Sequence, residues 1–233
     1  MSRVLPILFN TDMVQAILDG RKTVTRRIIK QDKVDSVLNS EVLKQTPEYP
    51  DEKSIKCLID APYEKGDILY IRETWQEWTG GYLYRAWPKG IHQPGTYKGM
   101  PWRPSIHMPK AAARIWLKVT DVRVDRLNNM TGQDILKEGV SSQVHPDADY
   151  FDVNQKEMFE QLWDSTIPKR QQDLYSWDAN PWVWVIEFER CEKPKKPYQK
   201  PKKPYQKPEV LSQGDSTNTA CRNFLMGRFM GIK

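Results

Sequence analysis

The sequence predicts one α+β domain of five or six strands with short helices, followed by a basic tail. Two observations support this fold class. Segments of alternating or β-branched apolar residues recur along residues 4–190 and are typical of strands. Short amphipathic segments between them start at a capping residue and stop at glycine, as helices do. A small sheet with helices of this kind forms an α+β domain and is usually closed or half-closed, because free edges invite aggregation.

The strand predictions rest on alternation and on β-branched residues. The longest pattern alternates Ile115, Leu117 and Val119 with polar or aromatic residues. The alternation fits a closed barrel and an open sheet equally well. The predicted strands are Val4–Phe9, Thr23–Ile29, Ile68–Thr74, Tyr82–Trp87, Ala113–Leu127 and Pro181–Arg190.

Helices are predicted where capping residues flank an apolar stripe. Asn10 or Thr11 caps the first helix and Gly20 ends it, while Thr131 and Gly139 bound another. The predicted helices are Thr11–Asp19, Val34–Lys44, Thr131–Lys137 and Asn154–Trp163, the last with Met158, Phe159, Leu162 and Trp163 on one face. Residues 30–62 and 88–109 are predicted as a polar insertion and a long loop.

Composition argues against several classes of protein. Cys57, Cys191 and Cys221 are too far apart for a zinc motif or a disulfide framework. The apolar run Val4–Phe9 is too short for a signal peptide, and no run has the length of a membrane helix. We therefore expect a cytoplasmic protein with reduced thiols, no metal, no membrane contact and no cofactor.

The segment Gly20–Arg27 places four cations around a helix-to-strand turn. One interpretation is a solvated basic turn. The other is that Lys22 and Thr25 meet at one spot. Residues three apart in a regular strand point to opposite faces, so the two converge only if Lys22 belongs to the turn.

Four motifs in order resemble the ASCH family, and in particular its larger bacteriophage and prophage members. The motifs lie in residues 6–27, 66–75, 102–109 and 180–188. The resemblance implies a PUA-like mixed β-barrel that handles RNA or a modified nucleoside. Together with the Lys/Pro repeat it predicts a domain over 1–192, a Lys/Pro linker over 193–209 and a tail over 210–233 with space for one short helix.

Small members of the family include an amidohydrolase that removes the acetyl group of N4-acetylcytidine. The resemblance implies that Lys22, Thr25 and Glu138 correspond to its catalytic Lys, Thr and Glu. A neutral Lys can take the proton of a Thr hydroxyl that attacks an amide, and a Glu can pass a proton to the leaving amine. Large insertions separate this chain from those enzymes, so a non-catalytic RNA-binding protein and an ASCH-type ribonuclease remain alternatives.

Further candidate residues surround this set. Arg21, Arg26 and Arg27 are expected to lower the pKa of Lys22 or to bind phosphate. As a turn residue, Lys22 should tolerate truncation at a cost of about 0.5 kcal/mol. Trp163, Trp182 and Trp184 are expected in the core. Arginine and aromatic side chains can stack on bases, so the predicted binding residues also include Arg72, Glu73, Trp75, Trp102, Arg103 and His107.

The tail carries most of the net charge of +6. From residue 193 it has eight Lys and two Arg against one Glu and one Asp, which leaves −2 for residues 1–192. A Lys/Pro repeat favours an extended, disordered chain. We expect polyanion binding through Lys195, Lys196, Tyr198, Lys202, Lys203 and Tyr205, with a solubilising spacer or a polyproline ligand for a host protein as alternatives.

Overall fold

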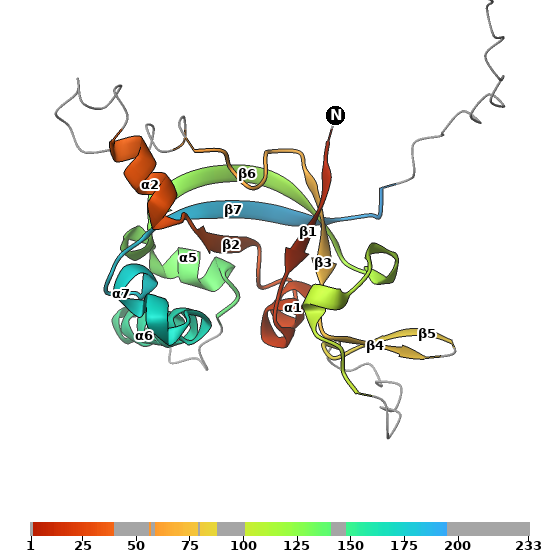
Figure 1. Ribbon diagram of the computed structural model, residues 1–233. Coiled ribbons are helices and arrows are strands. Elements are labelled where there is room, and N and C mark those ends of the chain that lie inside the picture. The colour runs from red at the N-terminus through yellow and green to blue at the C-terminus, as the bar shows by residue number, and fades with distance from the viewer. Residues whose placement is uncertain are drawn as a thin grey trace, which may run out of the picture. The chain divides into compact units, whose positions relative to one another are not determined.

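The computed structural model describes residues 2–39, 56, 59–78, 80–87, 101–140 and 148–194 (Figure 1). The chain divides into two units, Met1–Pro194 and Lys195–Lys233. The second unit, with the predicted Lys/Pro repeat and the short helix, lies outside the described residues. Among the described helices, none is long and apolar enough to cross a membrane.

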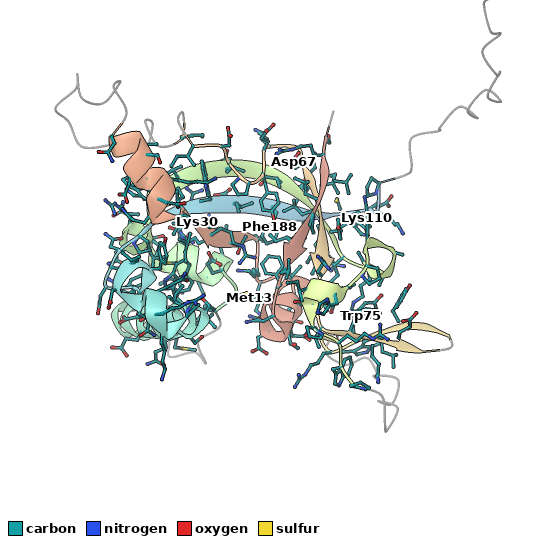
Figure 2. All side chains as sticks on the ribbon, viewed as in Figure 1. Met13, Lys30, Asp67, Trp75, Lys110 and Phe188 are labelled. Atoms are coloured by element: carbon teal, nitrogen blue, oxygen red, sulfur yellow. The ribbon has the colours of Figure 1, made fainter. Side chains whose placement is uncertain are left out.

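Five strands form one mixed sheet, which confirms the α+β class. The strands are β1 (Val4–Leu8), β2 (Val24–Ile28), β3 (Ile68–Arg72), β6 (Trp116–Arg126) and β7 (Trp182–Cys191). Their order is β1-β3-β6-β7-β2, with β1 and β3 parallel and the other pairs antiparallel. A separate hairpin joins β4 (Trp75–Trp78) to β5 (Gly81–Tyr84), and Trp75 is labelled beside it in Figure 2.

Two helices, α1 and α5, begin and end at the caps that the sequence predicts. Asn10 accepts a hydrogen bond from the Met13 amide at 2.8 Å, and Gly20 has a φ of +76° after the first helix. Thr131 forms a capping box with Asp134. The α-helices are α1 (Thr11–Leu18), α2 (Gln31–Leu38), α5 (Gly132–Lys137), α6 (Ala148–Thr166) and α7 (Gln172–Tyr175), and short 3₁₀ turns lie at Ser105–His107, Lys110–Ala112, Leu127–Asn129 and Lys169–Gln171.

Strand β7 alternates between two cores. Val183 and Val185 pack with α5 and α6, in a cluster that includes Ile135 and Phe159. Trp184, Ile186 and Phe188 point into the main core, which the apolar sides of α1 and α2 cover. This period of two places buried side chains on both faces of the strand. Trp163 and Trp184 are buried as predicted, and Trp182 is half-buried.

Several boundaries differ from the predictions. Helix α6 begins at Ala148 and not at Asn154, and it ends at Thr166 and not at Trp163. The predicted strand Ile68–Thr74 ends at Arg72, and β4 follows as a separate short strand. The predicted strand Tyr82–Trp87 is the shorter β5, and α2 begins three residues before its predicted start. Each difference comes from pairing or packing with a distant segment, which local periodicity does not record.

The edge strands β1 and β2 are bridged by side chains. Arg27 Nη2 donates to the Leu8 carbonyl at 2.8 Å, and the Tyr63 hydroxyl donates to the Pro6 carbonyl at 2.9 Å. No ladder joins β1 to β2 within the described ranges. The sheet is therefore half-closed. The Arg27 side chain of β2 crosses from one edge strand to the other, and Tyr63 bonds to β1.

Candidate functional site

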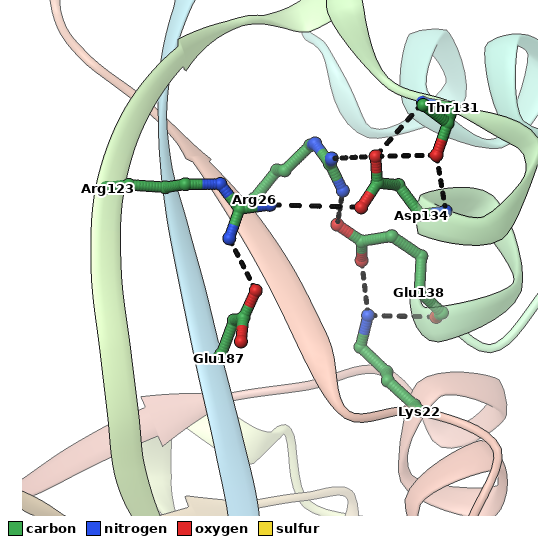
Figure 3. A network of polar contacts seen from close by, with 7 residues as sticks. All are labelled: Lys22, Arg26, Arg123, Thr131, Asp134, Glu138 and Glu187. Carbon is green, nitrogen blue, oxygen red and sulfur yellow. Dashed lines mark hydrogen bonds and ion pairs between the residues drawn. The ribbon is translucent and has the colours of Figure 1, made fainter.

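Lys22 and Glu138 meet where the end of α5 approaches the turn between α1 and β2 (Figure 3). Lys22 Nζ donates to Glu138 Oε2 at 2.5 Å and to the Glu138 carbonyl at 2.9 Å. The main chains of the two residues form an isolated β-bridge, and the Thr23 amide donates to the Lys137 carbonyl at 2.8 Å. Lys22 thus lies in the turn before β2, as convergence with Thr25 requires.

Lys22 is buried, which corrects the expectation of an exposed turn. Its side chain is 0% exposed and that of Glu138 is 6% exposed. The Gly-capped end of α1 folds back over the residues that follow it, because the Arg21 and Lys22 amides both donate to the Ala16 carbonyl. Truncation of Lys22 therefore leaves a buried carboxylate with one partner fewer.

Gly139 makes this close approach possible. Its φ of +87° is unfavourable for residues with a side chain. A Cβ at this position would lie 2.7 Å from Ala16 Cβ and 2.9 Å from Lys22 Cβ. Gly139 thus both ends α5 and leaves the space in which Lys22 packs against the end of that helix.

A second cation reaches the same carboxylate. Arg26 Nη1 donates to Glu138 Oε1 at 3.1 Å, and the Arg26 side chain is 1% exposed. Its Nη2 atom is buried and makes no hydrogen bond within the described part of the chain. Asp134 Oδ2 lies 3.9 Å from that atom, too far for a hydrogen bond. Arg26 therefore keeps donor capacity inside the site.

The network continues to the sheet through Asp134 (Figure 3). Asp134 Oδ1 lies 3.8 Å from Arg123 Nη2, and Arg123 donates to Glu187. Asp134 also accepts from the amide and hydroxyl of Thr131. Burial raises the pKa of Asp134, but the bonds from Thr131 and the nearby cations outweigh it, so the pKa is lower than usual. Asp134 thus stays charged and holds Arg26 and Arg123 in place.

The pKa of Lys22 is lower than that of an ordinary lysine. Burial is the largest cause, because it disfavours the charged amine. Glu138 acts in the opposite direction, while Arg27 and Arg26 lower the pKa further. Of the three arginines that are expected to lower the pKa of Lys22, Arg26 and Arg27 do so. Arg21 instead donates to the Gly139 carbonyl at 2.5 Å and pairs with Asp19.

Thr25 and Glu138 line one small cavity. It encloses about 80 Å³ and is walled mainly by apolar side chains of α1 and α6. Thr25 is 2% exposed and lies on β2 opposite Ile186 of β7. The lining residues are Met13, Thr25, Arg26, Arg27, Glu138, Phe159, Leu162, Trp163 and Thr166.

A larger cavity of about 330 Å³ shares residues with the first. It too is lined by Met13, Glu138 and Leu162, and it extends over Asn10 and Met158. Glu138 therefore faces a small inner cavity and a wider outer one, both lined by α1 and α6. The apolar residues of α6 that the sequence assigned to a core face also form the walls here.

Glu73 and Arg72 have structural partners. Glu73 is 1% exposed and receives two hydrogen bonds from Arg114, at 2.9 and 2.8 Å. Burial raises the pKa of Glu73, and Arg114 partly offsets the increase. Arg72 donates to the Ile106 carbonyl. Neither residue lines the two cavities, so the expectation that they stand beside Lys22 gains no support.

The predicted stacking residues differ in exposure. Trp75 is only 3% exposed, because β4 pairs with β5 and turns its ring toward Tyr82. It is therefore a packing residue, with the Arg103 guanidinium 5.2 Å from its ring centre. Trp102 is half-exposed, and Arg103 and His107 are exposed. These three can contact a ligand at the surface.

Two sets of site residues could not be found by the sequence reasoning. Met13 and Leu162 look like ordinary apolar stripe residues, and only the packing of α1 near α6 makes them cavity walls. Arg114 carries no motif, yet it fixes Glu73. Among the described residues, no three metal-binding side chains gather in one place.

Comparison with known proteins gives matches only among solved structures. No protein family model matches the chain, and no curated protein matches it. An ASCH domain from Lactobacillus crispatus matches with 10% identity and a TM-score of 0.33, covering 81% of this chain and 79% of that one. A DUF984 protein from Enterococcus faecalis matches with 12% identity and a TM-score of 0.33, covering 82% of this chain and 77% of that one. The solved structures to which this chain is similar thus include an ASCH domain, the family that its four sequence motifs resemble.

Proposed function

We propose that this protein is an amidohydrolase that removes a small acyl group from the N4 atom of a cytidine. One observation carries the proposal: the buried Glu138 carboxylate contacts Lys22 and Arg26 and lines the same cavity as the Thr25 hydroxyl. The proposed nucleophile and proton donor therefore line one space with apolar walls, and the proposed base, Lys22, contacts the proton donor from behind that wall. This is the set that acyl transfer requires.

In the resting protein, the Lys22 amine and the Glu138 carboxylate share one acidic proton. When substrate excludes water from the cavity, the neutral form of the pair is favoured, with the proton on Glu138 and a free amine on Lys22. The low pKa of Lys22 supports this form. Lys22 then takes the proton of Thr25 as its Oγ1 attacks the acyl carbonyl carbon.

The second half of the step releases the cytidine. Glu138 gives its proton to the N4 leaving group, the C–N bond breaks, and an acyl ester remains on Thr25. Water then attacks the ester and gives a proton to Glu138, while Lys22 returns its proton to Thr25. The products are a carboxylic acid and cytidine, and the pair again holds one proton.

Arg26 is suited to stabilise the oxyanion. Its Nη2 atom is buried, lacks a hydrogen bond within the described residues and belongs to a side chain that lines the cavity. A donor that is already in place when negative charge develops lowers the barrier without reorganisation. The inner cavity of about 80 Å³ suits a small acyl group, and the outer cavity has room for the base.

The test is to incubate the protein with a panel of N4-acylated cytidines and to follow the loss of the acyl group. Short acyl chains should be removed by the native protein, and Glu138→Gln should lower kcat by about 100-fold or more. Glu187→Gln is the matched control, because Glu187 pairs with Arg123 in the neighbouring network and does not line the cavity. No deacylation of any cytidine in the panel would contradict the proposal.

A non-catalytic RNA-binding role is the second candidate. It is favoured by Trp102, Arg103 and His107, which are half-exposed or exposed on one segment. In that case Trp102→Ala should weaken RNA binding, since the loss of a stacked base costs about 1–3 kcal/mol. Inspecting the RNA after incubation also tests the ribonuclease alternative, for which shortened RNA is the signature.

A further inference from the structure

A third cavity lies next to Arg27, at the edge strand β2 of the sheet. It encloses about 400 Å³ and is bordered by the end of β2, the start of α2 and residues 60–63. The residues that matter for its chemistry are Arg27, Lys30, Lys33, Asp60, Tyr63 and Trp184.

Cations outnumber anions on its walls. Arg27 is half-buried and held in place by its bond to the Leu8 carbonyl. Lys30 and Lys33 are exposed, and no described carboxylate lies within 4.0 Å of either amine. Asp60 is the one acidic residue among the lining residues. Three cations that line a concave surface with one carboxylate favour an anionic ligand.

Arg27 connects this cavity with the candidate active site. Its side chain lines both the inner cavity with Thr25 and the cationic cavity. The two cavities therefore share this residue in their walls. Tyr63 and Trp184 add aromatic surface to the walls, and Asp60 can accept hydrogen bonds from hydroxyl groups such as those of a ribose.

We propose that Arg27, Lys30 and Lys33 form a phosphate subsite, and that the substrate carries a phosphate on its nucleoside. The phosphate is either the monoester of a nucleotide or the diester of an RNA strand, since both present the same anionic oxygens. The identity of the nucleoside rests on the proposed function above. The binding of phosphate at this cavity does not.

The experiment measures binding of reaction products, so that no turnover is needed. The ligands are cytidine, cytidine 5′- and 3′-monophosphate, and a short single-stranded RNA that contains cytidine. The native full chain should bind the phosphate-bearing ligands more tightly than cytidine. Lys30→Gln with Lys33→Gln should weaken their binding about tenfold, which is about 1.4 kcal/mol over two contacts. The logarithmic salt slope for RNA should decrease by about 1.4, at about 0.7 per contact.

The matched control is Lys118→Gln with Lys169→Gln. It changes the net charge by the same amount, and these two lysines are exposed and do not line the cavity. The full chain keeps its basic tail in every variant, so the tail affects all of them alike. An equal loss in both double variants, or equal binding of cytidine and its monophosphates with no gain for RNA, would overturn the phosphate subsite.

The outcomes also separate the two sources of phosphate and the two proposals. A gain for the monophosphates assigns the subsite to a terminal phosphate, and a gain for RNA alone assigns it to a backbone diester. If phosphate-dependent binding needs Lys30 and Lys33 but no acylated cytidine is hydrolysed, the subsite stands and the proposed reaction fails. If acylated cytidine is hydrolysed and phosphate has no effect, the reaction stands and the subsite fails.

Discussion

Lys22 and Glu138 are joined twice, once through the carboxylate at 2.5 Å and once through the main-chain carbonyl at 2.9 Å. The second bond does not depend on the side chain of Glu138. A substitution of the Glu138 side chain therefore changes the charge beside Lys22, while the hydrogen bond from the Lys22 amine to the main-chain carbonyl remains. The effect of the carboxylate on the chemistry of Lys22 can therefore be tested without loss of the main-chain contact that holds the turn.

Replacing Lys22 by Met should lower the free energy of unfolding by about 3 kcal/mol, because a buried carboxylate loses a partner. Combining it with Glu138→Leu should not recover the loss, because the buried guanidinium of Arg26 then loses its carboxylate partner as well. Urea denaturation measures both. The control is Lys118→Met, which removes an exposed pair with Glu189 and should cost no more than about 1 kcal/mol. A loss for Lys22→Met as small as that of the control would contradict the prediction.

Replacing Thr25 by Val should abolish deacylation, because the methyl group keeps the shape of the side chain but removes the nucleophile. Thr25→Ser restores a hydroxyl and should recover part of the rate. Single-turnover assays with an N4-acylated cytidine measure this effect, and circular dichroism checks the fold. Equal rates for Thr25→Val and the native protein would exclude Thr25 as the nucleophile.

The rate of deacylation should fall as pH rises through the pKa of Lys22, because the Lys22–Glu138 pair then loses the one proton that Glu138 must give to the leaving group. Because burial lowers the pKa of Lys22, the midpoint should lie below the ordinary lysine value of 10.5. Between the lowered pKa of Lys22 in the folded protein and its ordinary value of 10.5, the folded state binds fewer protons than the unfolded state. The free energy of unfolding should therefore rise with pH in this window.

Arg26→Gln removes a cation that lowers this pKa, so the falling limb of the rate profile should move to higher pH. The matched control is Arg123→Gln, because Arg123 pairs with Glu187 and Asp134 and does not contribute to the Lys22 shift. A profile of kcat/KM against pH for each variant measures the shift. Identical midpoints for Arg26→Gln and the native protein would argue against Lys22 as the titrating base.

Replacing Gly139 by Ala should destabilise the protein more than replacing Gly20. Both glycines have positive φ, so both substitutions strain the backbone by about 1 kcal/mol or more. Only at Gly139 does the new Cβ come within 3.0 Å of other atoms, whereas nothing lies within 4 Å at Gly20. The difference between the two unfolding free energies isolates the contact with Ala16 and Lys22. Equal losses would show that the turn moves aside freely.

Local chemistry determined much of what the sequence could predict. Asn10, Thr131 and the glycines after α1 and α5 act within a few residues of themselves, so their roles as caps could be predicted. The convergence of Lys22 with Glu138 came from family resemblance. No local pattern links residues so far apart in the chain.

The remainder depends on long-range packing. The strand order β1-β3-β6-β7-β2 joins segments distant in sequence, and the same alternation is compatible with several orders. The burial of Lys22 and of Trp75 was also missed, because a polar or loop-like neighbourhood in sequence does not reveal what later folds over it. Arg114 could not be paired with Glu73 for the same reason.

The side-chain bridges over the outer edge of β1 also bear on how the protein behaves at high concentration. A free strand edge lets another chain extend the sheet through backbone hydrogen bonds. On β1 the carbonyls of Pro6 and Leu8 already accept bonds from Tyr63 and Arg27, and Pro6 has no amide hydrogen to offer. An incoming strand would find two carbonyls already bonded and no amide hydrogen at Pro6, so this edge of β1 is protected against edge-to-edge association.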